Sequence, residues 1–128
     1  MGESSQIRVF VVEDNEVSAL LAEEVLKSAG YVVHLARSGK ELQTLLDQSR
    51  PDLILMDIQL PGEDGLAITE RLRADPATSE IPVVIATAYP MPGDRAQAKW
   101  MHVASYVTKP YAPLQLLQIV WEVLKARG

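Results

Sequence analysis

The sequence predicts one α/β domain, in which a five-stranded parallel sheet carries helices on both faces. Short apolar stretches rich in β-branched residues alternate along the chain with stretches of helical periodicity. The stretch LILMDIQLPGEDG, residues 53–65, runs four apolar residues without alternation into Asp57. Such a run, followed by turn residues, is typical of a strand buried on both faces of a parallel sheet.

Length and composition agree with one ordinary globular domain. The chain has 128 residues, of which 48% are hydrophobic, and we expect a disordered start over residues 1–6 and one domain over residues 7–126. The net charge of −5 gives no electrostatic reason to expect nucleic acid or an anionic membrane as a partner. No apolar run approaches the ~20 residues of a membrane span. The lack of cysteine excludes disulfides and thiolate metal sites, and it fits a cytoplasmic location.

The first three elements have clear local signals. Residues 7–12 and 32–35 are apolar and β-branched, as expected of strands. Residues 16–29 between them have helical periodicity, and Gly30 is placed where a helix ends. The expected buried stripe of this helix consists of Val17, Leu20, Leu21, Val25 and Ala29.

Two further helices flank the stretch that ends in Asp57. Ser38 and Glu41 form a capping-box pattern for a helix that ends before Pro51. Beyond Asp57, an apolar pattern outlines a helix that ends near residues 75–76. Its apolar-face residues are Leu66, Ile68, Thr69 and Leu72.

The last third of the chain supplies two strands and two helices. Strands are expected at residues 83–86, bounded by Thr87, and at residues 105–107. The loop at 89–94 holds two prolines and a glycine, and a short helix is expected at 94–101. Pro113 opens the final helix, which runs to about residue 125. Five strands alternating with five helices imply right-handed crossovers and a flavodoxin-like (βα)5 sheet of order 2-1-3-4-5.

Polar residues follow these strands at their carboxyl ends. Glu13 and Asp14 follow the first strand, Asp57 ends the third, and Thr87 and Lys109 follow the fourth and fifth. In this topology all of them lie at one sheet edge, beside the switch point between strands one and three. Three carboxylates held together repel one another, so we expect some to be protonated or neutralised by a cation. Oxygen ligands favour Mg²⁺, or Mn²⁺ in its place, over zinc.

The chemistry that fits this edge is phosphoryl transfer to a carboxylate. A metal, a lysine and a hydroxyl would neutralise phosphoryl oxygens, and Asp57 would accept the group as an acyl phosphate. No GxxxxGK[ST] or GxGxxG loop is present, so the expected donor is a phosphorylated partner rather than a nucleotide. The alternative for Asp57 alone is a helix cap or a loop acid.

Four segments in order resemble the receiver domain of two-component response regulators. They are VVEDNE (11–16), DLILMDIQLPGEDG (52–65), PVVIATA (82–88) and YVTKP (106–110). The resemblance covers about residues 7–124 and is nearest to stand-alone receivers of bacterial chemotaxis and cell-cycle control, as well as receivers attached to hybrid kinases. Chemotaxis receivers are themselves a standard example of the flavodoxin-like order, so the two expectations are not independent.

The resemblance implies a phosphorylation site centred on Asp57. Asp57 would be the phosphoacceptor, and its donor would be a histidine kinase or a histidine phosphotransfer protein. Glu13, Asp14, Asp57 and the backbone carbonyl of Gln59 would bind Mg²⁺. Gln59 and Tyr89 would also tune the lifetime of the acyl phosphate.

The resemblance also implies a switch. Lys109 would bind the phosphoryl group, with a cis bond to Pro110, while Thr87 and Tyr106 match the pair that moves on phosphorylation. The function expected is therefore a phosphorylation-activated signalling switch that acts through a changed partner-binding surface. We expect no enzymatic activity beyond its own phosphorylation and slow autodephosphorylation.

The final helix carries more apolar surface than one sheet contact needs. At ~100° per residue its sheet-facing stripe consists of Pro113, Leu116, Leu117, Val120, Val123 and Leu124. Leu114 and Trp121 lie on one shoulder of this stripe, and Ile119 lies on the other. We expect these three residues to form a partner or homodimer surface with the helix at 94–101 and the fifth strand; extra core is the alternative.

Two alternatives to a stand-alone switch remain from the sequence. The chain is either complete or a receiver fragment of a hybrid kinase or larger regulator. The other alternative is an aspartate-nucleophile phosphatase. That enzyme class needs a second acid two residues after the nucleophile, where this chain has Gln59.

Overall fold

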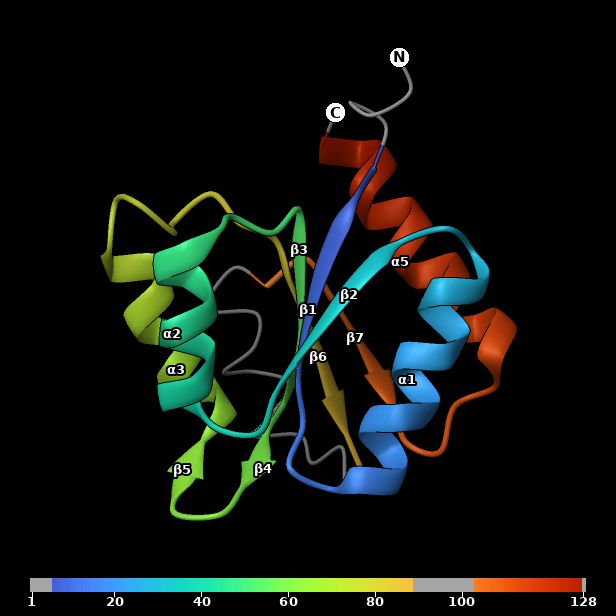
Figure 1. The fold of residues 1–128 in the computed structure, drawn as a ribbon, viewed down its shortest axis with the longest axis horizontal. Coiled ribbons are helices and arrows are strands. Elements are labelled where there is room, and N and C mark those ends of the chain that lie inside the picture. The colour runs from blue at the N-terminus through green and yellow to red at the C-terminus, as the bar shows by residue number, and fades with distance from the viewer. Residues whose placement is uncertain (1–5, 89–102, 128) are drawn as a thin grey trace.

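The computed structural model describes residues 6–88 and 103–127, and in these ranges the chain forms a parallel five-stranded sheet flanked by helices (Figure 1). The strand order β2-β1-β3-β6-β7 is the expected 2-1-3-4-5 order, so the predicted fold class is confirmed. The expected helix at 94–101, the loop at 89–94 and residues 1–5 of the expected disordered start lie outside the described residues.

Most elements lie within two residues of their predicted bounds. The sheet strands are β1 (Arg8–Val12), β2 (Val32–Ala36), β3 (Leu53–Asp57), β6 (Val83–Thr87) and β7 (Ser105–Thr108). The described helices are α1 (Glu16–Ser28), α2 (Gly39–Gln48), α3 (Gly65–Ala74) and α5 (Pro113–Arg127).

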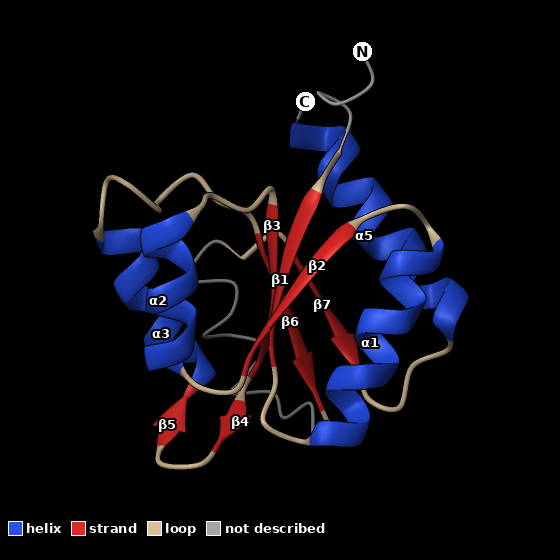
Figure 2. Ribbon diagram, viewed as in Figure 1, coloured by secondary structure: helices blue, strands red, loops and turns tan. Residues whose placement is uncertain are grey.

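Helices lie on both faces of the sheet (Figure 2), and a layer of buried side chains packs between each face and its helices. On β1, Phe10 and Val12 pack on the side of α2 and α3, whereas Val9 and Val11 pack on the side of α1 and α5. This is the alternation that a strand's two-residue period imposes. All five residues of β3 are buried, as are all five of β6, which confirms that the apolar run before Asp57 is a central strand.

Local capping sets where the helices begin and end. Asn15, Ser38 and Asp64 are N-caps, whose side-chain oxygens accept hydrogen bonds from backbone N–H groups in the first turns of α1, α2 and α3. Gly30 has φ +94°, a left-handed conformation that favours glycine just beyond a helix. The predicted capping box is present in altered form, because the Glu41 carboxylate accepts from Arg37 N–H (2.7 Å).

The predicted buried stripe of α1 is largely wrong. Its buried residues are Ala19, Ala22, Val25 and Leu26, whereas Val17, Leu20 and Leu21 are exposed by 75%, 52% and 49%. Only Val25 of the predicted stripe is buried. The physical reason is that alanines form part of the packed face, where small side chains allow a helix to lie close to a sheet. The packed face therefore combines these alanines with Val25 and Leu26, and Val17, Leu20 and Leu21 lie on the solvent side.

The turn after Asp57 is more ordered than predicted. Residues 59–64 form a small antiparallel hairpin, with β4 (Gln59–Leu60) paired to β5 (Glu63–Asp64). Gly62 at its tip has φ +69°, and the Leu60 side chain is buried in the core. The hairpin therefore links the end of β3 firmly to the start of α3.

The final helix agrees with its predicted stripe except at the first position. Leu116 and Val120 are buried, and Leu117, Val123 and Leu124 are partly buried against the core, but Pro113 is exposed. Pro113 is the first residue of the helix and lies before its first buried turn, so the angular count placed it on a face that it does not reach.

Gly65→Ala should destabilise the protein although alanine favours helices. A Cβ atom at Gly65 would lie 2.1 Å from the carbonyl oxygen of Asp57, which is backbone and cannot rotate away. We expect a loss of about 2 kcal/mol in the free energy of unfolding, the range of overpacked sites. Urea unfolding measures it. Unchanged or increased stability would show that α3 does not need this close approach.

Candidate functional site

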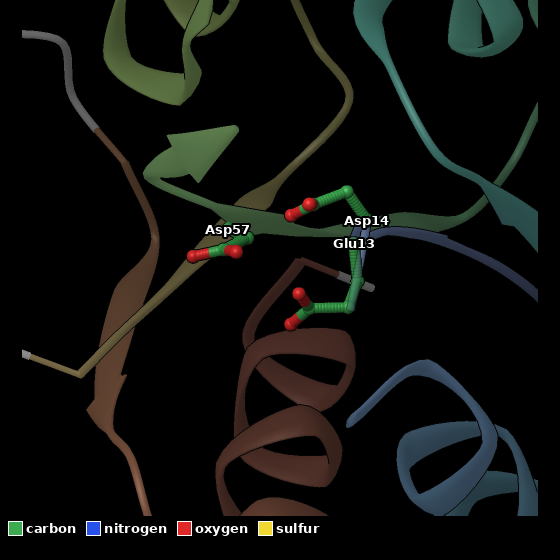
Figure 3. Close-up of side chains that lie close together, drawn as sticks. All are labelled: Glu13, Asp14 and Asp57. Carbon is green, nitrogen blue, oxygen red and sulfur yellow. The ribbon is translucent and has the colours of Figure 1, made fainter. Parts of the chain in front are cut away.

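Three carboxylates meet at the carboxyl edge of the sheet. Glu13 and Asp14 follow β1, Asp57 ends β3, and one carboxylate oxygen from each lies within 4.8 Å of the others. Figure 3 shows the side chains of Glu13 and Asp14 both directed toward the side on which Asp57 lies. Glu13 and Asp57 are only 6% and 5% exposed, while Asp14 is half-buried. This is the cluster that the strand order predicts.

The register of the sheet explains this convergence. Val12 pairs with Met56, so the residues that follow them on β1 and β3 are neighbours. Asp57 pairs with Ala86 on β6, and Thr87 pairs with Thr108 on β7, immediately before Lys109. Four parallel strands therefore end in chemically active residues at one edge.

Lys109 lies between two of the acids. Its ammonium group is ion-paired with Glu13 Oε1 and is 3.6 Å from Asp57 Oδ2. The second oxygen of Glu13 accepts a hydrogen bond from Asn15 N–H at 3.1 Å. The peptide bond from Lys109 to Pro110 is cis, as the resemblance implies. Lys109 is thus shared by Glu13 and Asp57 rather than committed to one of them.

The carboxyl group of Asp57 is unusually basic. Burial is the main cause that raises its pKa to about 6, and the charge of Glu13 raises it further. The charge of Lys109 and a hydrogen bond from Gln59 N–H to Oδ1 (3.1 Å) lower this pKa and only partly offset the burial. The raised pKa of Asp57 is therefore mainly an effect of burial, and the crowding of carboxylates expected from the sequence makes a smaller contribution.

The residues predicted to form the switch occupy neighbouring strands. Thr87 is buried at the end of β6, and half-buried Tyr106 on β7 packs against the core on the side of α2 and α3. Tyr106 pairs with Ile85, two residues before Thr87, so both lie on one face of the sheet. Gln59 is exposed on β4, and Tyr89 lies outside the described residues.

A cavity beside Lys109 brings in residues that the sequence did not single out. Its volume is about 360 Å³, and its lining residues are Ser18, Leu21, Ala88, Lys109, Pro110 and Tyr111. The pKa of the Tyr111 hydroxyl is raised by burial and by the negative charges of Glu13 and Asp57, which places this ring near the acids. The only sequence signal for Tyr111 is its position two residues after Lys109.

The donor set fits a hard divalent cation. With all three acids ionised, three negative charges face the single positive charge of Lys109, which leaves a net charge of −2 on these four groups. The available ligands are oxygens, the type that Mg²⁺ prefers. None of the described helices is long and apolar enough to cross a membrane.

Comparisons with known proteins agree on one family. Residues 9–121 match the family model of the response regulator receiver domain. A relative, the polar-differentiation response regulator DivK of Brucella anthropi, is 37% identical over 112 residues, which cover 88% of this chain and 91% of the relative.

Two solved structures add information on the state of such sites. The receiver domain of a sensor histidine kinase from Pseudomonas aeruginosa, with a magnesium ion in its active-site cleft, is 31% identical, with a TM-score of 0.84 and coverage of 94% of this chain and 98% of that one. The phosphorylated cyanobacterial phytochrome response regulator RcpA is 34% identical, with a TM-score of 0.79 and coverage of 92% and 91%.

Asp57→Asn should stabilise the metal-free protein at pH 7 but not at pH 4. Because the folded-state pKa is raised from 3.8 to about 6, the unfolded chain releases this proton first as the pH rises. The free energy of unfolding of the wild type therefore falls as the pH rises from 3.8 to about 6, and it stays lower at higher pH. Asparagine is neutral throughout, so the gain at pH 7 should reach at most about 3 kcal/mol.

Urea unfolding of both proteins in chelator at the two pH values measures this difference. An equal difference at pH 4 and pH 7 would contradict the role of Asp57 ionisation.

Proposed function

We propose that this chain, which belongs to the family of response regulator receiver domains, is a switch that accepts a phosphoryl group on Asp57 from a phosphohistidine donor. One observation carries the proposal. The buried Asp57 lies beside two further carboxylates and 3.6 Å from Lys109, at the edge where four strands end. A histidine kinase or a histidine phosphotransfer protein is the class of partner that would supply this group.

In the proposed reaction one phosphoryl group moves from the donor histidine to Asp57. An Asp57 carboxylate oxygen attacks phosphorus, an O–P bond forms, and the N–P bond of phosphohistidine breaks. The leaving imidazole keeps the electron pair and takes up a proton. With a pKa of about 6, Asp57 is mostly ionised at neutral pH and so is ready to attack. The Lys109 ammonium group and the Thr87 hydroxyl would bind the phosphoryl oxygens.

Mg²⁺, or Mn²⁺ in its place, would be held by the carboxylates of Glu13, Asp14 and Asp57 and by the backbone carbonyl of Gln59. When bound, the ion supplies positive charge to the acids and to the transferred phosphoryl group. The net negative charge around Lys109 supports this assignment, as does the magnesium ion in the cleft of the Pseudomonas kinase receiver. Glu13 could bind the ion through Oε2, which accepts a hydrogen bond from Asn15 N–H, or through the oxygen that Lys109 contacts.

The proposed switch has no enzymatic activity beyond its own phosphorylation and slow autodephosphorylation. An aspartate-nucleophile phosphatase needs a second acid two residues after the nucleophile, and the exposed amide Gln59 cannot serve as one. A cytoplasmic location is supported by the lack of cysteine, and a protein rather than a nucleic-acid partner by the net charge of −5.

The exposed side of α1 is the surface that we assign to the phosphate donor. Val17, Leu20 and Leu21 are large apolar residues on the first turns of this helix, next to the acidic pair in sequence. Leu21 also lines the cavity beside Lys109. A donor that docks there would bring its phosphohistidine close to Asp57.

A second exposed surface, on α5, suits the downstream partner. Leu114 is 78% exposed, and Trp121 is 53% exposed with the Lys125 ammonium group 4.7 Å from its ring centre. These exposures support a contact surface over extra core for both residues. Ile119 is half-buried against the core and lines a groove with Pro82 and Ser105, so it would contribute only an edge. Tyr106 packs on the opposite face of the sheet from α5, so the strand β7 itself, paired with β6, would couple this surface to Thr87.

Acetyl phosphate should label the wild-type chain only when Mg²⁺ or Mn²⁺ is present. Asp57→Asn should abolish the label, because an amide cannot form the acyl phosphate. Asp47→Asn, which changes an exposed aspartate on α2, is the matched control and should label normally. Mass spectrometry of the intact protein measures the added phosphate. Labelling of the Asp57→Asn variant, or full labelling of the wild type in excess chelator, would refute the assignment.

The two proposed surfaces should separate in function. The double variant Val17→Ser and Leu20→Ser should slow transfer from a phosphorylated histidine phosphotransfer protein by about 10-fold, because it removes apolar area that docking would bury. Labelling by acetyl phosphate should not change. Trp121→Ala should keep both reactions and weaken phosphorylation-dependent self-association or partner binding, measured by sedimentation. Equal transfer rates in the double variant and the wild type would exclude α1 as the donor surface.

A further inference from the structure

The backbone of Gln59 carries two tasks at the proposed site. Its N–H group donates a hydrogen bond to Asp57 Oδ1 at 3.1 Å, and its carbonyl is a proposed ligand of Mg²⁺. The side chain of Gln59 is exposed, so the hairpin around it must fix the position of these backbone groups. A hairpin with two residues in each strand is marginal by itself. Contacts from the hairpin to the rest of the domain therefore decide how well the Gln59 carbonyl is placed.

One such contact is made by Glu63 on β5. Its Oε2 accepts a hydrogen bond of 3.0 Å from Gly39 N–H, the first residue of α2, and its Oε1 lies 3.7 Å from Arg71 on α3. Glu63 pairs with Leu60 across the hairpin, and the neighbouring pair is Gln59 with Asp64. This carboxylate therefore ties the far strand of the hairpin to the N-terminus of α2, where a negative charge is favourable.

The glycine at position 39 leaves room for this contact. A Cβ atom there would lie 2.4 Å from Glu63 Oε1 and 3.1 Å from the Ile68 side chain. The hydrogen bond from Gly39 N–H to Glu63 in its present geometry thus depends on the absence of a side chain at position 39. Ser38 caps the same helix through Glu41 N–H, so α2 has another cap that does not involve the hairpin.

We propose that Glu63 is a positioning residue for the metal and phosphoryl site, a role that rests on the function proposed above. By holding the β4–β5 hairpin against α2, Glu63 keeps the Gln59 carbonyl and N–H group beside Asp57. The other anchors of this segment are the buried Leu60 side chain and the hydrogen bond from Gly65 N–H to Ile58 O (2.9 Å). Leu60 packs in the core cluster that also holds Leu42 of α2, whereas Glu63 adds a directed hydrogen bond to the first N–H group of that helix.

The test compares Mg²⁺ affinity across four variants of the full chain by calorimetry, with the amide NMR signal of Gln59 as a local readout. Glu63→Leu should weaken Mg²⁺ binding by about 10-fold, the lower end for groups that orient metal ligands, and should shift the Gln59 signal. Glu63→Gln keeps an oxygen acceptor and should recover most of the affinity. Gly39→Ala should weaken binding too, although alanine favours α2. Ser38→Ala removes only the separate cap and should bind Mg²⁺ like the wild type.

The outcomes separate this inference from the proposed function. If the wild type binds no Mg²⁺ at these acids, the proposed function fails, and the positioning role fails with it. If the wild type binds Mg²⁺ and Glu63→Leu binds it equally well, only the positioning role is wrong. An equal loss in Ser38→Ala would also overturn that role, because the effect would then follow the general stability of α2.

Discussion

The burial of neighbouring carboxylates governs the chemistry of this sheet edge. Glu13, Asp14 and Asp57 place oxygens within 4.8 Å of one another, and Lys109 is the single cation ion-paired with any of them among the described residues. Burial removes the water that would weaken the repulsion between the carboxylates. A bound proton or a divalent cation therefore stabilises this edge. The same need links the raised pKa of Asp57 to the fit of this edge to Mg²⁺.

The rest of the fold holds these charges in place. The fully buried strands β3 and β6 fix the positions of Asp57 and Thr87 along the sheet. The close approach at Gly65 fixes the start of α3 against the Asp57 backbone. The apolar core thus offsets the unfavourable crowding at its edge. Figure 1 places α1 and α5 on the same face of the sheet. The proposed donor surface on α1 and the proposed output surface on α5 therefore lie on one side of the sheet, not on opposite sides.

Much of this arrangement could be predicted from the sequence. Apolar strands without alternation indicate a parallel sheet, and the polar residues that follow these strands mark the sheet edge at which the site lies. The features that could not be predicted depend on contacts between residues far apart in the sequence. The count of large apolar residues misassigned the face of α1, since Ala19 and Ala22 pack there while Leu20 stays exposed. The hairpin at 59–64 contains no long strand pattern, and the contact from Glu63 to Gly39 spans 24 positions. No local signal reports such a pairing.

The identity of the phosphorylated residue tests the central claim most directly. After reaction of the wild-type chain with a phosphorylated donor and Mg²⁺, borohydride reduces an acyl phosphate to an alcohol, so a phosphorylated aspartate becomes homoserine. Peptide mass spectrometry then locates the reduced residue. If the crowded edge works as described, homoserine appears at position 57 and nowhere else. Reduction at Asp14 or at an acid outside the cluster, with Asp57 intact, would contradict the account.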